Sequence, residues 1–209
     1  MTTDWFRGSA WDPASREDFE RRLARARPSN RSQYIRIKAL ALAAAGQPDA
    51  ARNLFERVIR EHKDSLDCRA SVEHLADLAR SQGDDANAEA YRELLTSWPD
   101  LNATSGMAEV SLAELLLKRG NRDEAQEALR LLQSAMQRRS ALQLNANLFR
   151  WHLALIRAAE AIGDGATVKK AAGTALRLAD RGPQFPRHPD VGVVRAEPKT
   201  IQWLRERAG

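Results

Sequence analysis

Cysteine is almost absent from this sequence, because Cys68 is the only one among 209 residues. A single cysteine cannot form a disulfide bond within the chain or supply the several thiolates of a structural zinc site. The sequence also lacks an apolar run near the length of about 18 residues that a membrane-spanning helix needs, and its first residues do not resemble a signal peptide. We therefore expect a soluble cytoplasmic protein without a membrane partner.

Aromatic residues are also scarce, at 6% of the chain, whereas hydrophobic residues as a whole make up 43%. The apolar content is sufficient for a sizeable core, which argues against a disordered chain. Alanine, leucine, arginine and glutamate dominate the composition, and these residues lose little side-chain freedom in a helix. The composition predicts an all-α protein.

A repeat is present at a fixed period. Gly46, Gly83 and Gly120 are separated by a constant 37 residues, and an alanine follows each of them five residues later. On both sides of each glycine, apolar residues recur with the i, i+3, i+4, i+7 spacing of a helix face. Glycine is suited to the left-handed position that ends a helix. Each glycine is thus predicted to occupy the turn of an antiparallel helical hairpin.

A weaker fourth copy of the hairpin centres on Gly163, 43 residues after Gly120. The additional residues fall within 134–146, where we expect longer flanking helices or a longer loop. Ser15, with Asp18 three residues later, is a variant of the capping box and predicts an N-terminal helix over the first repeat. The repeat domain is expected to span residues 15–180, with hairpins at about 30–65, 69–98, 105–137 and 144–180.

Two end segments differ from the repeats. Residues 1–14 contain Trp5, Phe6 and Trp11, which either pack on the first helices or form an exposed anchor. Residues 181–209 contain three closely spaced prolines, which favour an extended course, and then a helix-start proline, Pro198. This C-terminal segment is expected to end in a short helix, and it either folds back as a lid over the last hairpin or binds a partner as a flexible tail.

The hairpins resemble the tetratricopeptide repeat over roughly residues 30–180. The small position of the first helix is matched by Ala39, Ala76 and Ala113, and the alanine of the second helix by Ala51, Ala88 and Ala125. The sequence departs from the pattern at other positions. The first large position holds Ile35, Val72, Glu109 and His152, the aromatic of the second helix survives only as Phe55, and the closing proline only as Pro99, one place early. The resemblance implies a right-handed α-solenoid of about four stacked antiparallel hairpins, and a generic α-solenoid is the alternative.

In the resembled family, exposed positions of the first helices line a concave groove that binds a protein or peptide. The resemblance therefore implies a non-catalytic adaptor or scaffold with a groove of mixed charge and a few apolar contacts. The charged groove positions map to Arg36, Glu73, Asp77, Arg80, Glu114, Lys118, Arg150 and Arg157, and the other positions to Gln33, Leu40, Met107, Val110, Leu153 and Glu160.

No catalytic, cofactor or metal site is predicted. The four histidines are His62, His74, His152 and His188, and no pair has the i, i+4 spacing that directs two imidazoles at one metal. Cys68, His74 and Asp77 lie close in sequence, but no nucleophile signature accompanies them, and an ordinary exposed trio is favoured. Gly163 and Gly165 resemble a phosphate loop only weakly, because no strand precedes them, and they are interpreted as a hairpin turn.

The formal net charge of +5 makes nucleic acid the main alternative partner. Basic residues are in excess near both ends of the chain, around Arg21, Arg25, Arg187 and Arg195, but acidic residues are interleaved with them. Binding of a protein or peptide is therefore favoured over binding of RNA or DNA. A third possibility is a regulatory subunit of an associated enzyme or toxin.

Overall fold

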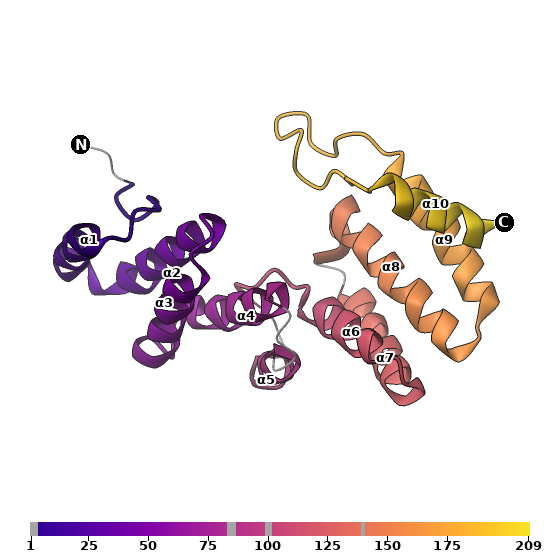
Figure 1. Ribbon diagram of the computed structural model, residues 1–209, viewed down its shortest axis with the longest axis horizontal. Coiled ribbons are helices and arrows are strands. Elements are labelled where there is room, and N and C mark those ends of the chain that lie inside the picture. The colour runs from indigo at the N-terminus through magenta and orange to yellow at the C-terminus, as the bar shows by residue number, and fades with distance from the viewer. Residues whose placement is uncertain (1–3, 83–86, 99–101, 139–140) are drawn as a thin grey trace. The chain divides into compact units, whose positions relative to one another are not determined.

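A computed structural model describes residues 4–82, 87–98, 102–138 and 141–209 of the chain. In these residues the regular structure consists of ten α-helices and one short 3₁₀ helix, with no strand (Figure 1). The all-α prediction is confirmed. The chain divides into two compact units, Met1–Ser105 and Gly106–Gly209, which we call the N-terminal and C-terminal units.

In the N-terminal unit, each helix from α2 onward packs on the next one along the chain, and α4 also packs on α2. Proline stands in the first turn of three of these helices, where its missing N–H needs no partner. The helices are α1 (Pro13–Arg25), α2 (Pro28–Ala44), α3 (Pro48–Glu61), α4 (Leu66–Ser81) and α5 (Asn87–Ser97).

Helix α1 begins earlier than the capping box predicts. Asp12 is its N-cap, and the Asp12 carboxylate accepts the backbone N–H groups of Ala14 and Ser15 at 3.1 Å each. The expectation that Ser15 caps this helix is wrong, because Pro13 starts the helix and leaves Ser15 inside the first turn. The hydroxyl of Ser15 instead donates to Asp12 at 2.6 Å.

The N-terminal aromatic residues pack on the first helices. Phe6 is buried in the same core cluster as Phe19 of α1, and Trp5 and Trp11 are partly buried against that cluster. Their ring centroids lie 5.3 Å (Trp5) and 5.6 Å (Trp11) from that of Phe19. The segment therefore covers α1 and α2, as the first of the two alternatives predicts.

In the C-terminal unit the helices again pack consecutively, and α8 also packs on α6. Of the inserted residues 134–146, the first five continue α7 to Arg138 and the last two begin α8 at Asn145; a 3₁₀ turn, Ala141–Gln143, lies between the two helices. The helices are α6 (Ala108–Arg119), α7 (Arg122–Arg138), α8 (Asn145–Ile162), α9 (Gly165–Ala179) and α10 (Pro198–Ala208).

The C-terminal segment folds back on this unit. Helix α10 packs on α9 (Figure 1). Its Leu204 is fully buried. Residues 185–192 do not follow the extended course expected from the prolines, because they form consecutive turns closed by the hydrogen bonds from the His188 N–H to the Phe185 carbonyl and from the Val191 N–H to the His188 carbonyl. The side chain of Gln184 anchors the turns, since its Oε1 accepts the N–H of Asn145 at 2.6 Å.

The glycines that mark the period lie at helix ends. Gly46, Gly120 and Gly163 have φ angles of +74°, +75° and +83°, and each follows the last turn of its helix. An added side chain is strained in this left-handed region, which explains the choice of glycine. The predicted turn positions of Gly46 and Gly120 are confirmed, Gly163 is a hairpin turn as expected, and Gly83 lies outside the described residues.

The positions shared by the repeats face the core even where the sequence departs from the family pattern. At the first large position Ile35 and Val72 are buried, and so is Glu109, with 1% of its surface exposed. The small positions Ala39, Ala76 and Ala113 and the second-helix positions Ala51 and Ala125 are buried as well, whereas the side chain of Ala88 and all of Pro99 lie outside the described residues. The register of the repeats is thus kept although the residue type changes.

His152 occupies the same position in α8 and gives a testable pH dependence. Its Nδ1 is buried and has no hydrogen-bond partner among the described residues. Burial, and secondarily the positive charge of Arg177, lowers the pKa of His152 from 6.5 to about 4. The folded protein therefore takes up the proton less readily than the unfolded chain, so stability is complete above pH 6.5 and decreases as the pH falls toward 4.

We expect His152→Leu to remove this loss. Between pH 7 and pH 4, the free energy of unfolding of the wild type should fall by about 1.5 kcal/mol more than that of the variant, as measured by urea unfolding. This figure is smaller than the full pKa shift would give, because the ring is partly solvated. The other titrating groups are common to both proteins and cancel in this comparison. If the free energies of unfolding of the two proteins changed in parallel with pH, His152 would have the same pKa in the folded and unfolded states.

Candidate partner-binding surface

Arg36, on α2, takes part in a contact between the first helices of two consecutive hairpins, α2 and α4. Its Nε donates to Asp67 Oδ1 at 2.7 Å, and Ser32 donates to the other oxygen of that carboxylate at 2.8 Å. The Arg36 and Asp67 side chains are only 22% and 19% exposed. The pair links α2 to the start of α4, so Arg36 contributes to the packing of the N-terminal unit.

Glu73, on α4, is not an exposed groove residue. Only 2% of its surface is accessible, and its carboxylate accepts the backbone N–H of Ser105 at 2.7 Å and the Ser105 hydroxyl at 2.6 Å. The expectation of exposure at this position is wrong, because the loop that contains Ser105 folds over the helix. The Glu73 carboxylate holds that loop against α4.

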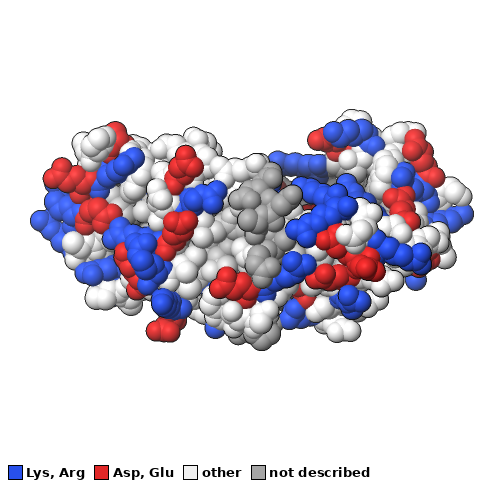
Figure 2. All heavy atoms as spheres, turned by 60° about the horizontal axis from the view of Figure 1, so that its bottom comes forward, with Lys and Arg blue, Asp and Glu red and all other residues white. Residues whose placement is uncertain are grey.

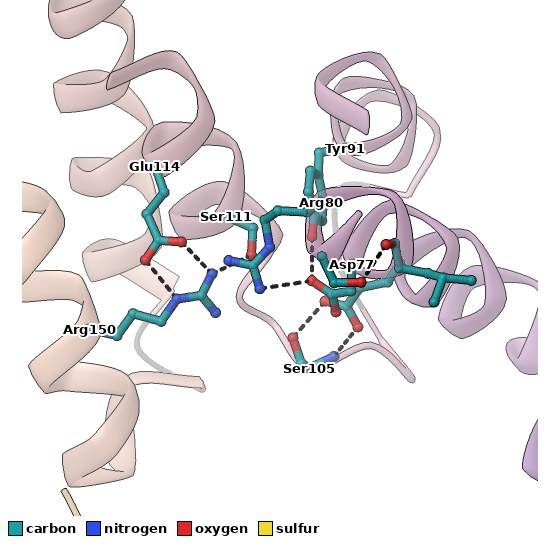
Figure 3. Close-up of polar contacts among 10 residues, drawn as sticks. Asp77, Arg80, Tyr91, Ser105, Ser111, Glu114 and Arg150 are labelled. Carbon is teal, nitrogen blue, oxygen red and sulfur yellow. Dashed lines mark hydrogen bonds and ion pairs between the residues drawn. The ribbon is translucent and has the colours of Figure 1, made fainter. Parts of the chain in front are cut away.

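Asp77 and Arg80 lie one turn further along α4 and form an i, i+3 ion pair with an N–O distance of 3.5 Å. Asp77 also accepts a hydrogen bond from the Tyr91 hydroxyl of α5, as Figure 3 shows. Tyr91 is fully buried, so this contact joins the two helices of one pair. Arg80 and Asp77 are half-buried.

In the C-terminal unit, Arg150 of α8 holds Glu114 of α6 in a two-point contact (Figure 3). Its Nε and one terminal nitrogen donate to the two carboxylate oxygens at 2.7 and 2.6 Å, and the same nitrogen donates to the Ser111 hydroxyl at 2.9 Å. This geometry is typical of strong arginine–carboxylate pairs. As Arg36 and Asp67 do in the N-terminal unit, the pair connects two consecutive first helices.

Lys118 and Arg157 are the two exposed cations of the predicted set. Lys118 lies in the last turn of α6, and no carboxylate pairs with it in the part of the chain that the structure describes. The Arg157 guanidinium lies 5.9 Å from the ring centroid of Trp203 in α10. These two side chains, unlike Glu73, are accessible to a partner.

The charge pattern of the surface is mixed. On the face shown in Figure 2, lysine and arginine side chains are interspersed with aspartate and glutamate, and neither sign forms a continuous block. A phosphate backbone favours a continuous positive track, whereas a peptide of mixed charge can match such a surface. The pattern on that face agrees better with a protein or peptide partner.

Two of the residues considered for chemistry, Cys68 and His74, have pKa values shifted by burial. Burial raises the pKa of the Cys68 thiol, which is the opposite of what a cysteine nucleophile needs. His74 packs its ring 5.3 Å from that of Phe55, and burial lowers its pKa. Among the described residues, no three His, Cys, Asp or Glu side chains lie close enough to hold a metal ion.

Several residues of this surface were not found from the sequence. Asp67, Tyr91 and Ser105 contact the predicted residues from other elements. Trp203 approaches Arg157 from the C-terminal helix, for which the sequence left a lid and a flexible partner-binding tail as alternatives. Of these residues, only Asp67 could have been expected from the sequence. It lies in the first turn of α4, where a carboxylate stabilises the helix N-terminus.

A family model described as tetratricopeptide repeat matches residues 37–65, which include the second half of α2, the Gly46 turn and all of α3. No curated protein sequence is similar to the chain at a significant level. None of the described helices combines the length and the apolar character needed to cross a membrane.

Proposed function

Because the chain is a tetratricopeptide-like helical repeat protein, we propose that it is a non-catalytic adaptor or scaffold that binds a protein or peptide partner. The observation that carries the proposal is the match to this repeat, since such repeats generally serve protein–protein interaction. The binding surface would be the concave groove formed by the first helices. Its residues would be those predicted from the sequence, with Lys118 and Arg157 most accessible to the partner.

The finer features of the architecture belong to the same proposal. We propose right-handed winding of the helices within each unit and about four hairpins in the chain, in a cytoplasmic protein. The repeat domain would occupy residues 15–180, between the aromatic segment 1–14 and the C-terminal segment 181–209. Arg36, Glu73, Glu114 and Arg150 would shape the groove by holding its helices, because their side chains are used within the units.

The proposal is tested by selecting ligands for the purified full chain. A library of displayed random peptides and a pool of random single-stranded RNA are applied in parallel, and the affinities of the selected ligands are measured at two salt concentrations. We expect peptides to be enriched and their affinity to depend only weakly on salt. Enrichment of RNA alone, with a steep loss of affinity in salt, would overturn the proposal.

Lys118→Glu should weaken the binding of selected peptides without unfolding the protein. Loss of a good interface contact costs about 1 to 2 kcal/mol, whereas an exposed charge changes folding stability by less than about 0.5 kcal/mol. Calorimetry measures the first quantity and thermal unfolding the second. Lys170→Glu, an exposed lysine of α9, is the matched control and should leave binding unchanged. Equal effects of the two variants on peptide binding would show that Lys118 is not part of the binding surface.

Nucleic acid is the second candidate partner, and one cavity supports it. This cavity has a volume of about 500 Å³ and combines aromatic with cationic walls, an arrangement that suits stacked bases and phosphates. The walls of the cavity include Trp5, Tyr34, Arg21, Arg22 and Arg25. Asp18 already pairs with Arg21 and Arg22, which lowers the positive charge that the cavity offers to a phosphate.

A further inference from the structure

A second cavity lies in the C-terminal unit, between α8 and the C-terminal helix α10. Its volume is about 330 Å³, and its walls are Leu153 and Arg157 of α8 with Lys199, Thr200 and Trp203 of α10. Helix α10 packs on α9 (Figure 1), and its Trp203 and Arg207 side chains approach Arg157 and Glu160 of α8. The C-terminal helix therefore adds an aromatic and a cationic wall beside two residues of the predicted groove.

The Arg207 side chain holds the Trp203 ring in place. The Arg207 guanidinium stacks 4.3 Å from the ring centroid, and Glu160 fixes that arginine through a contact of 2.5 Å to its Nε. Arg157 lies 5.9 Å from the same ring. A fixed aromatic wall can accept an apolar side chain at little cost in conformational freedom.

The charges around the cavity favour an anion. Arg157 forms no ion pair with any described carboxylate. Lys199 pairs with Glu197 at 2.7 Å, but the two side chains are 83% and 66% exposed, so the pair is weak in water and can be exchanged for a partner's carboxylate. The Thr200 side chain adds a hydroxyl donor to the wall.

We propose that this cavity, which we call the α8–α10 pocket, binds an acidic segment of the protein partner. A carboxylate of the segment would lie between Arg157 and Lys199, and a neighbouring apolar side chain would pack against Leu153 and Trp203. The inference rests on the proposed function and names the chemistry of the partner. The mixture of two cations with an apolar wall complements an acidic peptide that carries one large apolar residue.

The test uses three labelled synthetic peptides with the full chain. The first, Gly-Glu-Asp-Leu-Phe-Glu-Asp-Gly, is acidic and apolar; the second has lysine in place of the acids, and the third has serine in place of Leu-Phe. We expect only the first to bind strongly by fluorescence anisotropy, with at least a tenfold lower Kd than the other two. It should also shift the indole N–H resonance of Trp203, which Trp203→Phe assigns.

Arg157→Glu should raise the Kd of the first peptide at least tenfold, while Arg205→Glu, an exposed position on α10, leaves it unchanged. Circular dichroism of both variants confirms that they fold. An unshifted Trp203 resonance, equal binding of the lysine peptide, or tighter binding of a single-stranded oligonucleotide would overturn the inference. Library-selected peptides that bind Arg157→Glu normally would refute the pocket but leave the adaptor proposal intact, whereas failure of all peptides would refute the adaptor proposal as well.

Discussion

Replacing Arg138 by methionine is expected to destabilise the C-terminal unit by about 3 kcal/mol, because it leaves a buried carboxylate without its counter-charge. Glu109 of α6 is 1% exposed, and Arg138 in the last turn of α7 donates to both of its oxygens, the Nε contact measuring 3.3 Å. Removal of one partner from a buried pair costs more than the pair itself contributes. Urea unfolding at neutral pH measures the change.

The double variant Glu109→Leu with Arg138→Met supplies the control. Leucine restores the large apolar residue that the repeat pattern has at this position, and neither residue of the pair is charged any longer. The double variant should therefore recover most of the stability lost in Arg138→Met, and replacement of such pairs by apolar residues is often neutral or stabilising. If the double variant is as unstable as the single one, the loss comes from packing around Arg138 and not from the unpaired Glu109.

Glu109 also shows how far the sequence predicts the fold. The helices and the glycine turns follow from local signals, namely the spacing of apolar residues and the conformational freedom of Gly46 and Gly120. Glu109 departs from the repeat pattern by residue type, yet it keeps the buried position of Ile35 and Val72. Its burial depends on Arg138, 29 residues away, and a single sequence does not indicate such a pairing.

The candidate surface was predicted less completely, for a related reason. Positions on a first helix indicate which side chains share a face, but exposure depends on what other elements cover. The loop at Ser105 covers Glu73, and α10 brings Trp203 beside Arg157. These are contacts between residues distant in sequence, so helical spacing alone could not separate the accessible Lys118 and Arg157 from the buried Glu73.

The second large effect is expected at Lys38, which fastens the N-terminal segment to α2. Lys38 is only 4% exposed, and its ammonium donates to the backbone carbonyls of Gly8 and Ala10 at 2.6 and 2.9 Å. The same nitrogen lies 5.2 Å from the ring centroid of Trp11, and burial lowers the pKa of the amine. Hydrogen bonds from a charged donor contribute about 1.5 to 3 kcal/mol each.

Lys38→Met keeps the apolar stem of the side chain but removes these donors. We expect a loss of about 2 to 3 kcal/mol, below the sum for two bonds, because the freed carbonyls of the exposed Gly8 and Ala10 can bond water and the cost of burying the ammonium disappears. Hydrogen exchange should show faster exchange in residues 5–12 before any change in α2. Lys63→Met, at an exposed position after α3, is the matched control and should leave both quantities unchanged. Unaltered exchange in residues 5–12 of Lys38→Met would mean that the aromatic packing of the segment and the hydrogen bond from Gln47 to the Ser9 carbonyl hold it without Lys38.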